Sequence, residues 1–142
     1  MTKKKIIIGY TSGVYDLFHV GHLNLLRRAK SMCDRLIVGV SSDELVRKVK
    51  KKSTIIPFDE RINIVQSIKF VDMTIPQRDP DKYLAWEKLK YDKLFVGDDW
   101  FKNKKWRQYE TKLSMKNVQV IYFEYTKTTS STKINKILNK HN

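Results

Sequence analysis

Short apolar runs alternate along this 142-residue chain with longer segments of helical periodicity. The clearest run, residues 35–40, is apolar at nearly every position, which is typical of a strand buried on both faces of a sheet. Strands and helices that alternate in this way are joined by right-handed crossovers and form a parallel sheet. The sequence therefore predicts an α/β fold, a doubly wound five-stranded parallel sheet with helices on both faces.

The same patterns give approximate bounds for each element. Strands are expected at residues 6–11, 35–40, 71–75, 93–96 and 118–123, the third of them stopped by Pro76. Helices are expected at about 20–32, 43–49, 59–68, 81–90, 103–115 and 131–139. Hydrophobic residues make up 41% of the chain, and no linker rich in Pro, Gly or Ser divides it. Residues 1–142 are therefore expected to form one domain.

Cysteine content and apolar run lengths bear on the compartment. The single cysteine, Cys33, allows no disulfide within the chain and is expected to be a small buried hydrophobe. No apolar run is long enough to span a membrane, and the run at residues 6–8 is too short for a signal peptide. These features predict a cytoplasmic protein with no membrane partner.

The formal net charge of +14 raises the question of an anionic partner. Nucleic acid is one candidate, but the excess comes largely from scattered lysines, with no arginine-rich arm or recognition-helix pattern. We therefore favour a lysine-rich surface with a pocket for anionic small molecules, and nucleic acid is not expected as the partner.

The motif His19-Val20-Gly21-His22 directly follows the first expected strand, at the start of a helix. Histidines three residues apart lie on one face of a helix, and the glycine between them lets a ligand approach the backbone. The free N–H groups of a helix N-terminus suit phosphate. The alternative is that one histidine caps the turn and the other is partly buried. Because Gly-x-Gly-x-x-Gly and Walker motifs are absent, we interpret the pair as a phosphate site of another type.

Other polar residues also follow strands. Asp43, residues 97–99 and residues 126–132 each come after an expected strand, as the histidines do. The carboxyl ends of parallel strands meet at one edge of the sheet, where ligands bind. The sequence therefore predicts that these groups gather into one site.

These motifs together resemble the signature of the cytidylyltransferases of the HxGH nucleotidyltransferase superfamily. The resemblance rests first on Gly13-Val14-Tyr15-Asp16 followed by His19-Val20-Gly21-His22. It continues through Ser42-Asp43-Glu44, Glu60-Arg61, Lys69-Phe70-Val71-Asp72, Gly97-Asp98-Asp99-Trp100 and Ser130-Ser131-Thr132-Lys133-Ile134. It covers nearly the whole chain, implies the Rossmann-like fold of that superfamily, and is strongest to the bacterial branch that acts on glycerol 3-phosphate.

The resemblance implies that CTP and a phosphomonoester react to give a CDP-alcohol and pyrophosphate. Glycerol 3-phosphate is the expected acceptor, which would give CDP-glycerol, a precursor of a cell-surface polymer. Phosphocholine, phosphoethanolamine or ATP as the donor are alternatives, and a basic nucleic-acid-binding module is the alternative from another class. Mg²⁺ is expected on the CTP phosphates, with no dedicated metal site in the protein. A homodimer is also implied.

Residue roles follow from the same resemblance. His19 and His22 would hold the α- and β-phosphates of CTP and stabilise the transition state as donors, and Lys52 would assist as a third catalytic group. The expected nucleotide-binding residues are Val14, Tyr15, His19, His22, Lys52, Asp98, Thr126, Ser130, Ser131 and Thr132. The expected substrate-binding residues are Asp16, Lys50, Lys82 and Arg61.

Several of these residues also have a simpler structural interpretation. The lysines at 50–52 could be a solvated charge run, and Arg61 could form a structural ion pair. Asp98 and the Ser/Thr cluster could be ordinary helix caps. The chain also departs from the family pattern at Tyr125, where relatives have arginine, and at Thr128, where they have glycine. Both departures leave the acceptor open.

Overall fold

The computed structural model describes residues 5–97, 104–124 and 131–140, with side chains omitted at 131 and 132. The strands are β1 (Ile8–Gly13), β2 (Arg35–Ser41), β3 (Met73–Gln77), β4 (Lys93–Gly97) and β5 (Gln119–Phe123). The helices are α1 (Val20–Ser31), α2 (Asp43–Lys50), α3 (Phe58–Gln66), α4 (Lys82–Leu89), α5 (Lys104–Ser114) and α6 (Ser131–Lys140). The order of elements confirms the predicted α/β class.

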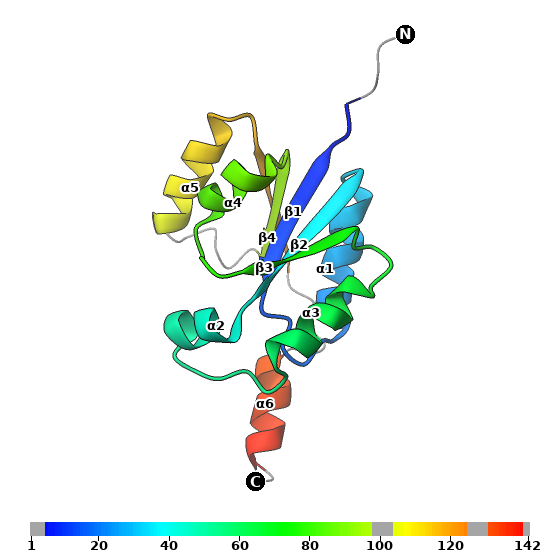
Figure 1. The fold of residues 1–142 in the computed structure, drawn as a ribbon, viewed down its shortest axis with the longest axis vertical. Coiled ribbons are helices and arrows are strands. Elements are labelled where there is room, and N and C mark those ends of the chain that lie inside the picture. Colours follow the sequence, from blue (N-terminus) through cyan, green and yellow to red (C-terminus); the bar gives the residue numbers. More distant parts are fainter. Residues whose placement is uncertain (1–4, 98–103, 125–130, 141–142) are drawn as a thin grey trace.

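All five strands are parallel and lie in the order β3-β2-β1-β4-β5. The chain moves outward from β1 to β3, returns to β4 beside β1, and continues outward to β5 (Figure 1). The order therefore reverses between β1 and β4, which is the switch point where sheets of this type bind ligands. The histidine motif follows β1 directly and so lies next to this point.

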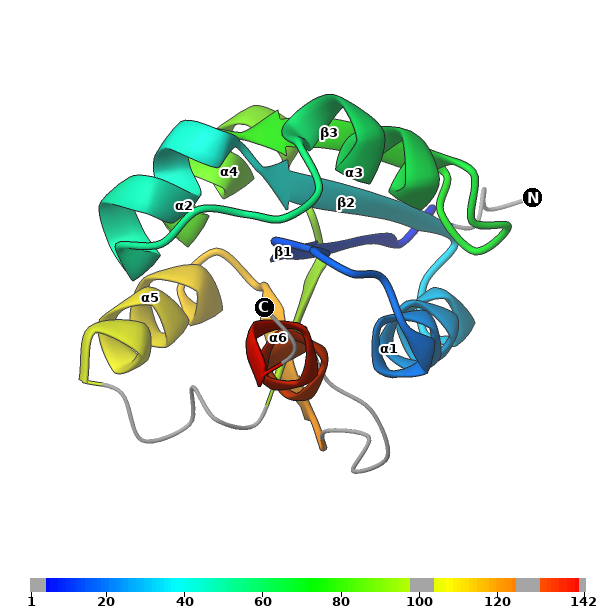
Figure 2. The same cartoon turned by 90° about the horizontal axis from the view of Figure 1, so that it is seen from below.

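Two hydrophobic cores lie on opposite faces of the sheet, as the helices in Figures 1 and 2 show. Side chains alternate along a strand, so β2 sends Leu36, Val38 and Val40 to the core under α1 and α3. Ile37 joins the other core, under α4 and α5. This alternation explains why residues 35–40 are apolar throughout, and it confirms the predicted helices on both faces.

The predicted end of the third strand is wrong. Pro76 does not stop this strand, because β3 runs through it to Gln77 and Pro76 pairs in register with Val40. Proline lacks an N–H donor and is therefore tolerated mainly on edge strands. Since β3 pairs only with β2, one side of it needs no hydrogen-bond ladder.

The structure also bears on Cys33 and on membrane-spanning helices. Cys33 is half-buried against the core under α1, and its thiol donates to the Ala29 carbonyl at 3.4 Å. Within the described ranges, no helix combines the length and the apolar character that crossing a membrane requires.

Arg61, in α3, has a side chain with no exposed surface. Its guanidinium donates to the carbonyls of Ile56, Val14 and Ser41 at 2.8, 2.7 and 2.8 Å. It also forms an ion pair with Asp43 at 2.6 Å. The ion pair given as the structural interpretation of Arg61 is therefore present, and a substrate contact for this residue stays a prediction. The guanidinium joins the residues that follow β1 and end β2 to the start of α2.

We expect Arg61→Met to lower the free energy of unfolding by about 3–5 kcal/mol, because it leaves the partly buried Asp43 carboxylate and three carbonyls without their donor. Arg47→Met removes the same charge from an exposed position on α2 and should change the stability by less than about 0.5 kcal/mol. Chemical denaturation of both variants measures the difference. Equal midpoints for the two variants would contradict the structural role of Arg61.

Candidate active site

The candidate site lies at the edge of the sheet where the strands end. The turn after β1, the start of α2, the segment from α2 to α3, and α6 all lie toward this end of the molecule (Figure 1). Some of the predicted site falls outside the described residues, namely Asp98, Thr126 and Ser130. The same holds for the side chains of Ser131 and Thr132, and for the departures at Tyr125 and Thr128.

The turn between β1 and α1 has an unusual backbone. Tyr15 and Leu17 adopt left-handed conformations, with φ of 58° and 53°. Such conformations cost energy for residues other than glycine and persist where the surroundings enforce them. Here the Tyr15 ring is buried, with its ring centroid 6.3 Å from that of Phe18 and 5.3 Å from that of His22. The structure thus shows Tyr15, which the sequence predicts to bind the nucleotide, packing against His22.

The two histidines are held in one arrangement by the start of α1. The His19 side chain caps the helix, because its Nδ1 accepts from the Gly21 N–H at 3.0 Å. The Nδ1 of His22 accepts from the His19 N–H at 3.2 Å. The two ring centroids are 3.9 Å apart. The prediction that one histidine caps the turn and the other is partly buried is therefore confirmed. The two rings nevertheless lie next to each other, so this arrangement is compatible with a joint phosphate site.

This hydrogen bonding sets where the imidazole protons lie. A nitrogen that accepts a hydrogen bond carries no proton, so each neutral ring holds its proton on Nε2. Burial, together with the charge of His19, lowers the pKa of His22 to about 4, and the Asp16 carboxylate opposes this only in part. Burial also lowers the pKa of His19. Near neutral pH the pair therefore presents two adjacent N–H donors, which suits phosphate oxygens.

Asp16 is buried in the turn before the histidines. Its two carboxylate oxygens accept the backbone N–H groups of Ile55 and Ile56, each at 2.9 Å. The neighbouring Val14, predicted to touch the nucleotide, accepts from Arg61 through its carbonyl. The structure thus shows both residues in contacts within the protein, on the side of the turn that faces the segment before α3.

Asp43 lies at the start of α2 and binds residues of the segment that leads to α3. Burial raises the pKa of the Asp43 carboxyl, but hydrogen bonds from Arg61, the Phe58 N–H and Thr54 outweigh it and lower the pKa. Asp43 therefore stays ionised and ties the start of α2 to the start of α3. The sequence marked Asp43 as a polar residue after a strand and as part of the family motif Ser42-Asp43-Glu44, but nothing in the sequence indicated Thr54 as its partner.

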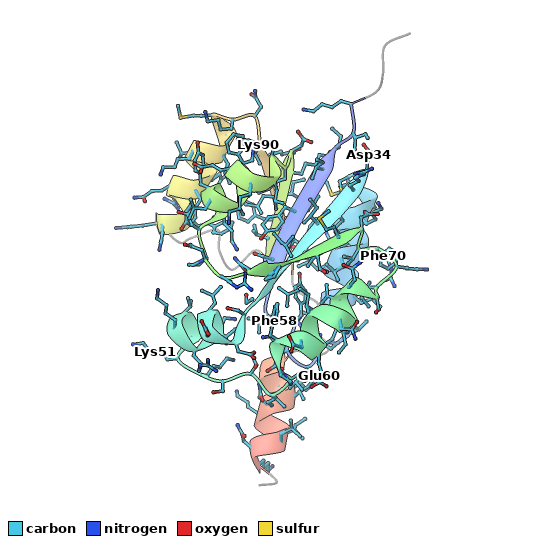
Figure 3. The ribbon with its side chains drawn as sticks, in the orientation of Figure 1. Asp34, Lys51, Phe58, Glu60, Phe70 and Lys90 are labelled. Carbon is cyan, nitrogen blue, oxygen red and sulfur yellow. The ribbon has the colours of Figure 1, made fainter. Side chains whose placement is uncertain are left out.

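The predicted lysines lie on what we call the lysine segment, residues 50–57. Lys50 ends α2, and Lys51 and Lys52 follow it, all three with exposed side chains. Lys51 adopts a left-handed conformation with φ of 53° and caps the helix. Figure 3 labels Lys51 and Phe58, which lie near the two ends of this segment. The segment thus runs from exposed cations to the two N–H groups that contact Asp16.

Lys82, at the start of α4, approaches the end of β1 from the other side. Its Nζ donates to the Ser12 hydroxyl. Burial lowers the pKa of Lys82 to about 8. Within the described ranges, no carboxylate forms an ion pair with it. A partly buried ammonium that forms no ion pair with a carboxylate is a candidate for holding an anion. Sequence reasoning did not identify Ser12, although this residue directly precedes Gly13 at the strand end.

Comparisons with known proteins agree with this arrangement. A model of the cytidylyltransferase-like family matches residues 10–137. A glycerol-3-phosphate cytidylyltransferase of Staphylococcus aureus is 37% identical over 125 residues, covering 87% of this chain and 89% of that protein. An FAD synthase of Thermococcus kodakarensis is 30% identical over 139 residues, covering 97% of this chain and 93% of that protein.

A solved structure shows the same fold. The crystal structure of the lipopolysaccharide core biosynthesis protein from Thermoplasma volcanium superposes with a TM-score of 0.72 at 24% identity. The alignment covers 88% of this chain and 100% of that one. The family match extends over the histidine pair, Asp43, the lysine segment and Lys82. The chain therefore belongs to the cytidylyltransferase-like family and is a nucleotidyltransferase with a nucleotide substrate.

Proposed function

We propose that this enzyme transfers a cytidylyl group from CTP to a phosphorylated small alcohol, with glycerol 3-phosphate as the acceptor. The products are CDP-glycerol and pyrophosphate. The observation that carries the proposal is the pair of neutral imidazoles at the start of α1, with both Nε2 donors set by backbone hydrogen bonds. The glycerol-3-phosphate cytidylyltransferase relative at 37% identity supports the choice of donor and acceptor.

The reaction needs positioning more than proton transfer. A phosphate oxygen of the acceptor is already anionic and attacks the α-phosphorus of CTP without a strong base. A new P–O bond forms as the bond to the β-phosphate oxygen breaks, and pyrophosphate leaves with its electron pair. Negative charge grows on the bridging and terminal oxygens in the transition state. His19 and His22 donate from Nε2 to these oxygens, as preorganised neutral donors.

Cations bring the two anionic substrates together. In this proposal Lys50 and Lys52 contact the phosphates from the lysine segment, as mobile point charges. Lys82 holds the phosphate of the acceptor at the end of β1. Mg²⁺ would be held mainly by the CTP phosphates and would neutralise part of their charge. Across the described parts of the chain, no group of three or more His, Cys, Asp or Glu side chains is placed to hold a metal ion.

ATP is the second candidate for the nucleotide donor. The FAD synthase relative, at 30% identity over 97% of this chain, favours testing it, because FAD contains an adenylyl group. The residues expected to contact the base include Asp98, which lies outside the described part of the chain. A homodimer and a cytoplasmic location remain predictions from the sequence.

A matrix of nucleotides against phosphoalcohols tests the proposal. CTP with glycerol 3-phosphate and Mg²⁺ should release pyrophosphate faster than CTP with phosphocholine or phosphoethanolamine, and faster than ATP with any acceptor. Coupled pyrophosphate detection measures each rate, with the reaction lacking an acceptor as the blank. Faster release with ATP would favour adenylyl transfer, and no release in any well would exclude both candidates.

Three substitutions at His22 separate its two nitrogens. His22→Ala should lower kcat by about 100- to 1000-fold, as expected for loss of a transition-state donor. His22→Asn keeps an acceptor near Nδ1 for the His19 N–H but has no Nε2 donor, so it should be equally impaired. His22→Gln carries an amide N–H near the Nε2 position and should retain more activity than either. Steady-state kinetics with matched circular dichroism spectra provides the comparison, and a fully active Asn variant would contradict the donor role.

The lowered pKa of Lys82 predicts that binding of the acceptor weakens at alkaline pH. Burial lowers its pKa to about 8, so the side chain loses its charge as the pH rises through that value. The kcat/KM for the acceptor should therefore fall above about pH 8, because kcat/KM follows ionisation of the free enzyme. Lys82→Arg stays charged throughout, so the pH–rate profile of this variant should lack the fall near pH 8. A fall that persists in Lys82→Arg would assign it to another group.

A further inference from the structure

The lysine segment has little burial to hold it in place. Residues 50–53 are exposed, and the Ile55 side chain is 50% exposed. The segment contains no strand and no helix after Lys50. At its start, the Lys51 N–H donates to the Arg47 carbonyl of α2 at 3.0 Å. Beyond Lys51, the position of the segment must depend on hydrogen bonds more than on packing, and Thr54, Ile55, Ile56 and Phe58 make such bonds.

Two carboxylates accept these hydrogen bonds. Asp43 accepts from the Thr54 hydroxyl at 2.9 Å and from the Phe58 N–H at 3.2 Å. Asp16 accepts from the consecutive N–H groups of Ile55 and Ile56, both at 2.9 Å. Asp43 fixes the segment to its own neighbours, α2 and α3. Asp16 fixes the segment directly to the turn that carries the histidines, and Arg61 links the two indirectly, through the carbonyls of Ile56 and Val14.

The turn around Asp16 is built to hold that carboxylate in place. Tyr15 and Leu17, on either side of it, both adopt left-handed conformations. The Val14 carbonyl just before them accepts from the buried Arg61, and His19, three residues after Asp16, caps α1. A carboxylate between such constraints has little freedom, so it can define the position of the two N–H groups that it accepts.

We propose that Asp16 is a positioning residue, which places the lysine segment against the histidine pair so that lysine and imidazole groups act on the same phosphates. This assignment rests on the proposed function and replaces the substrate contact expected for Asp16 from the sequence. The proposal rests on the charge-assisted hydrogen bonds that the N–H groups of Ile55 and Ile56 donate to the Asp16 carboxylate. Asp16 touches no substrate in this role and acts through the lysines.

Asp16→Asn tests the assignment, because an amide presents one acceptor oxygen instead of two. Hydrogen exchange at the Ile55 and Ile56 amides should become at least about tenfold faster, since one charge-assisted bond is lost and the other weakened. The KM for CTP should rise about tenfold while kcat falls less, because looser cations weaken phosphate binding. A purely structural loss would instead lower the active fraction, and hence kcat, with KM unchanged.

Asp34→Asn is the matched control. Asp34 also accepts a backbone N–H, that of Ile7 at 2.7 Å, but it lies at the opposite end of the sheet (Figure 3). The Asp34→Asn variant should leave both the amide hydrogen exchange at Ile55 and Ile56 and the KM for CTP unchanged. Asp16→Glu keeps both acceptor oxygens one methylene further out and should be intermediate in both measurements. This variant also keeps the test available if Asp16→Asn folds poorly.

A binding measurement separates this inference from the proposed reaction. Calorimetric titration with pyrophosphate needs no turnover, and its Kd should rise about tenfold in Asp16→Asn, the loss expected for a charged contact. If the wild-type enzyme transfers no nucleotide, but exchange and pyrophosphate affinity change as expected, only the proposed function fails. Unchanged exchange at Ile55 and Ile56 would overturn the positioning role, and so would faster exchange with unchanged pyrophosphate affinity.

Discussion

The buried guanidinium of Arg61 is the contact on which the arrangement of the site depends. Removing such a group from water is costly, and the cost is offset here by one carboxylate and three carbonyls. Those acceptors come from the turn after β1, the end of β2, the start of α2 and the segment before α3. Because the guanidinium is planar, it satisfies them together in only one relative placement. The ends of two neighbouring strands are thereby held in a single geometry.

That geometry explains why the histidine pair can work as neutral donors. The turn before α1 has two left-handed residues and would relax if its carbonyl at Val14 had no donor. With the turn held, the Nδ1 atoms of His19 and His22 meet backbone N–H groups and the protons stay on Nε2. The pKa values are lowered by burial in the same turn. The held turn thus sets three properties together: the left-handed backbone of Tyr15 and Leu17, the Nε2 tautomer of the histidines, and their neutral charge state.

Much of this could be predicted from local sequence, and the limits have physical causes. Periodicity alone gave the strands, the two covered faces and the edge where the site lies, because side-chain alternation and crossover handedness are local rules. The error at Pro76 arose because edge position in a sheet is not a local property. The family resemblance implied substrate contacts for Arg61 and Asp16, and that expectation stays a prediction. Their partners within the protein include backbone groups up to 47 positions away, which no spacing rule indicates.

The site combines imidazoles held in fixed positions with exposed lysines. This combination addresses the electrostatic repulsion between two anionic substrates bound side by side. The two proposed substrates, CTP and a phosphomonoester, repel each other, and the net charge of +14 lowers that cost over the whole surface. Such a field attracts phosphate but does not orient it. Orientation requires donors held at defined positions, which His19 and His22 would supply in the proposed reaction, and cations held near them without being rigid. A segment that is exposed along its lysines and tied to the turn after β1 at its far end would satisfy both needs in the proposed reaction, because its cations could follow the phosphates while that end stays in register with the histidines.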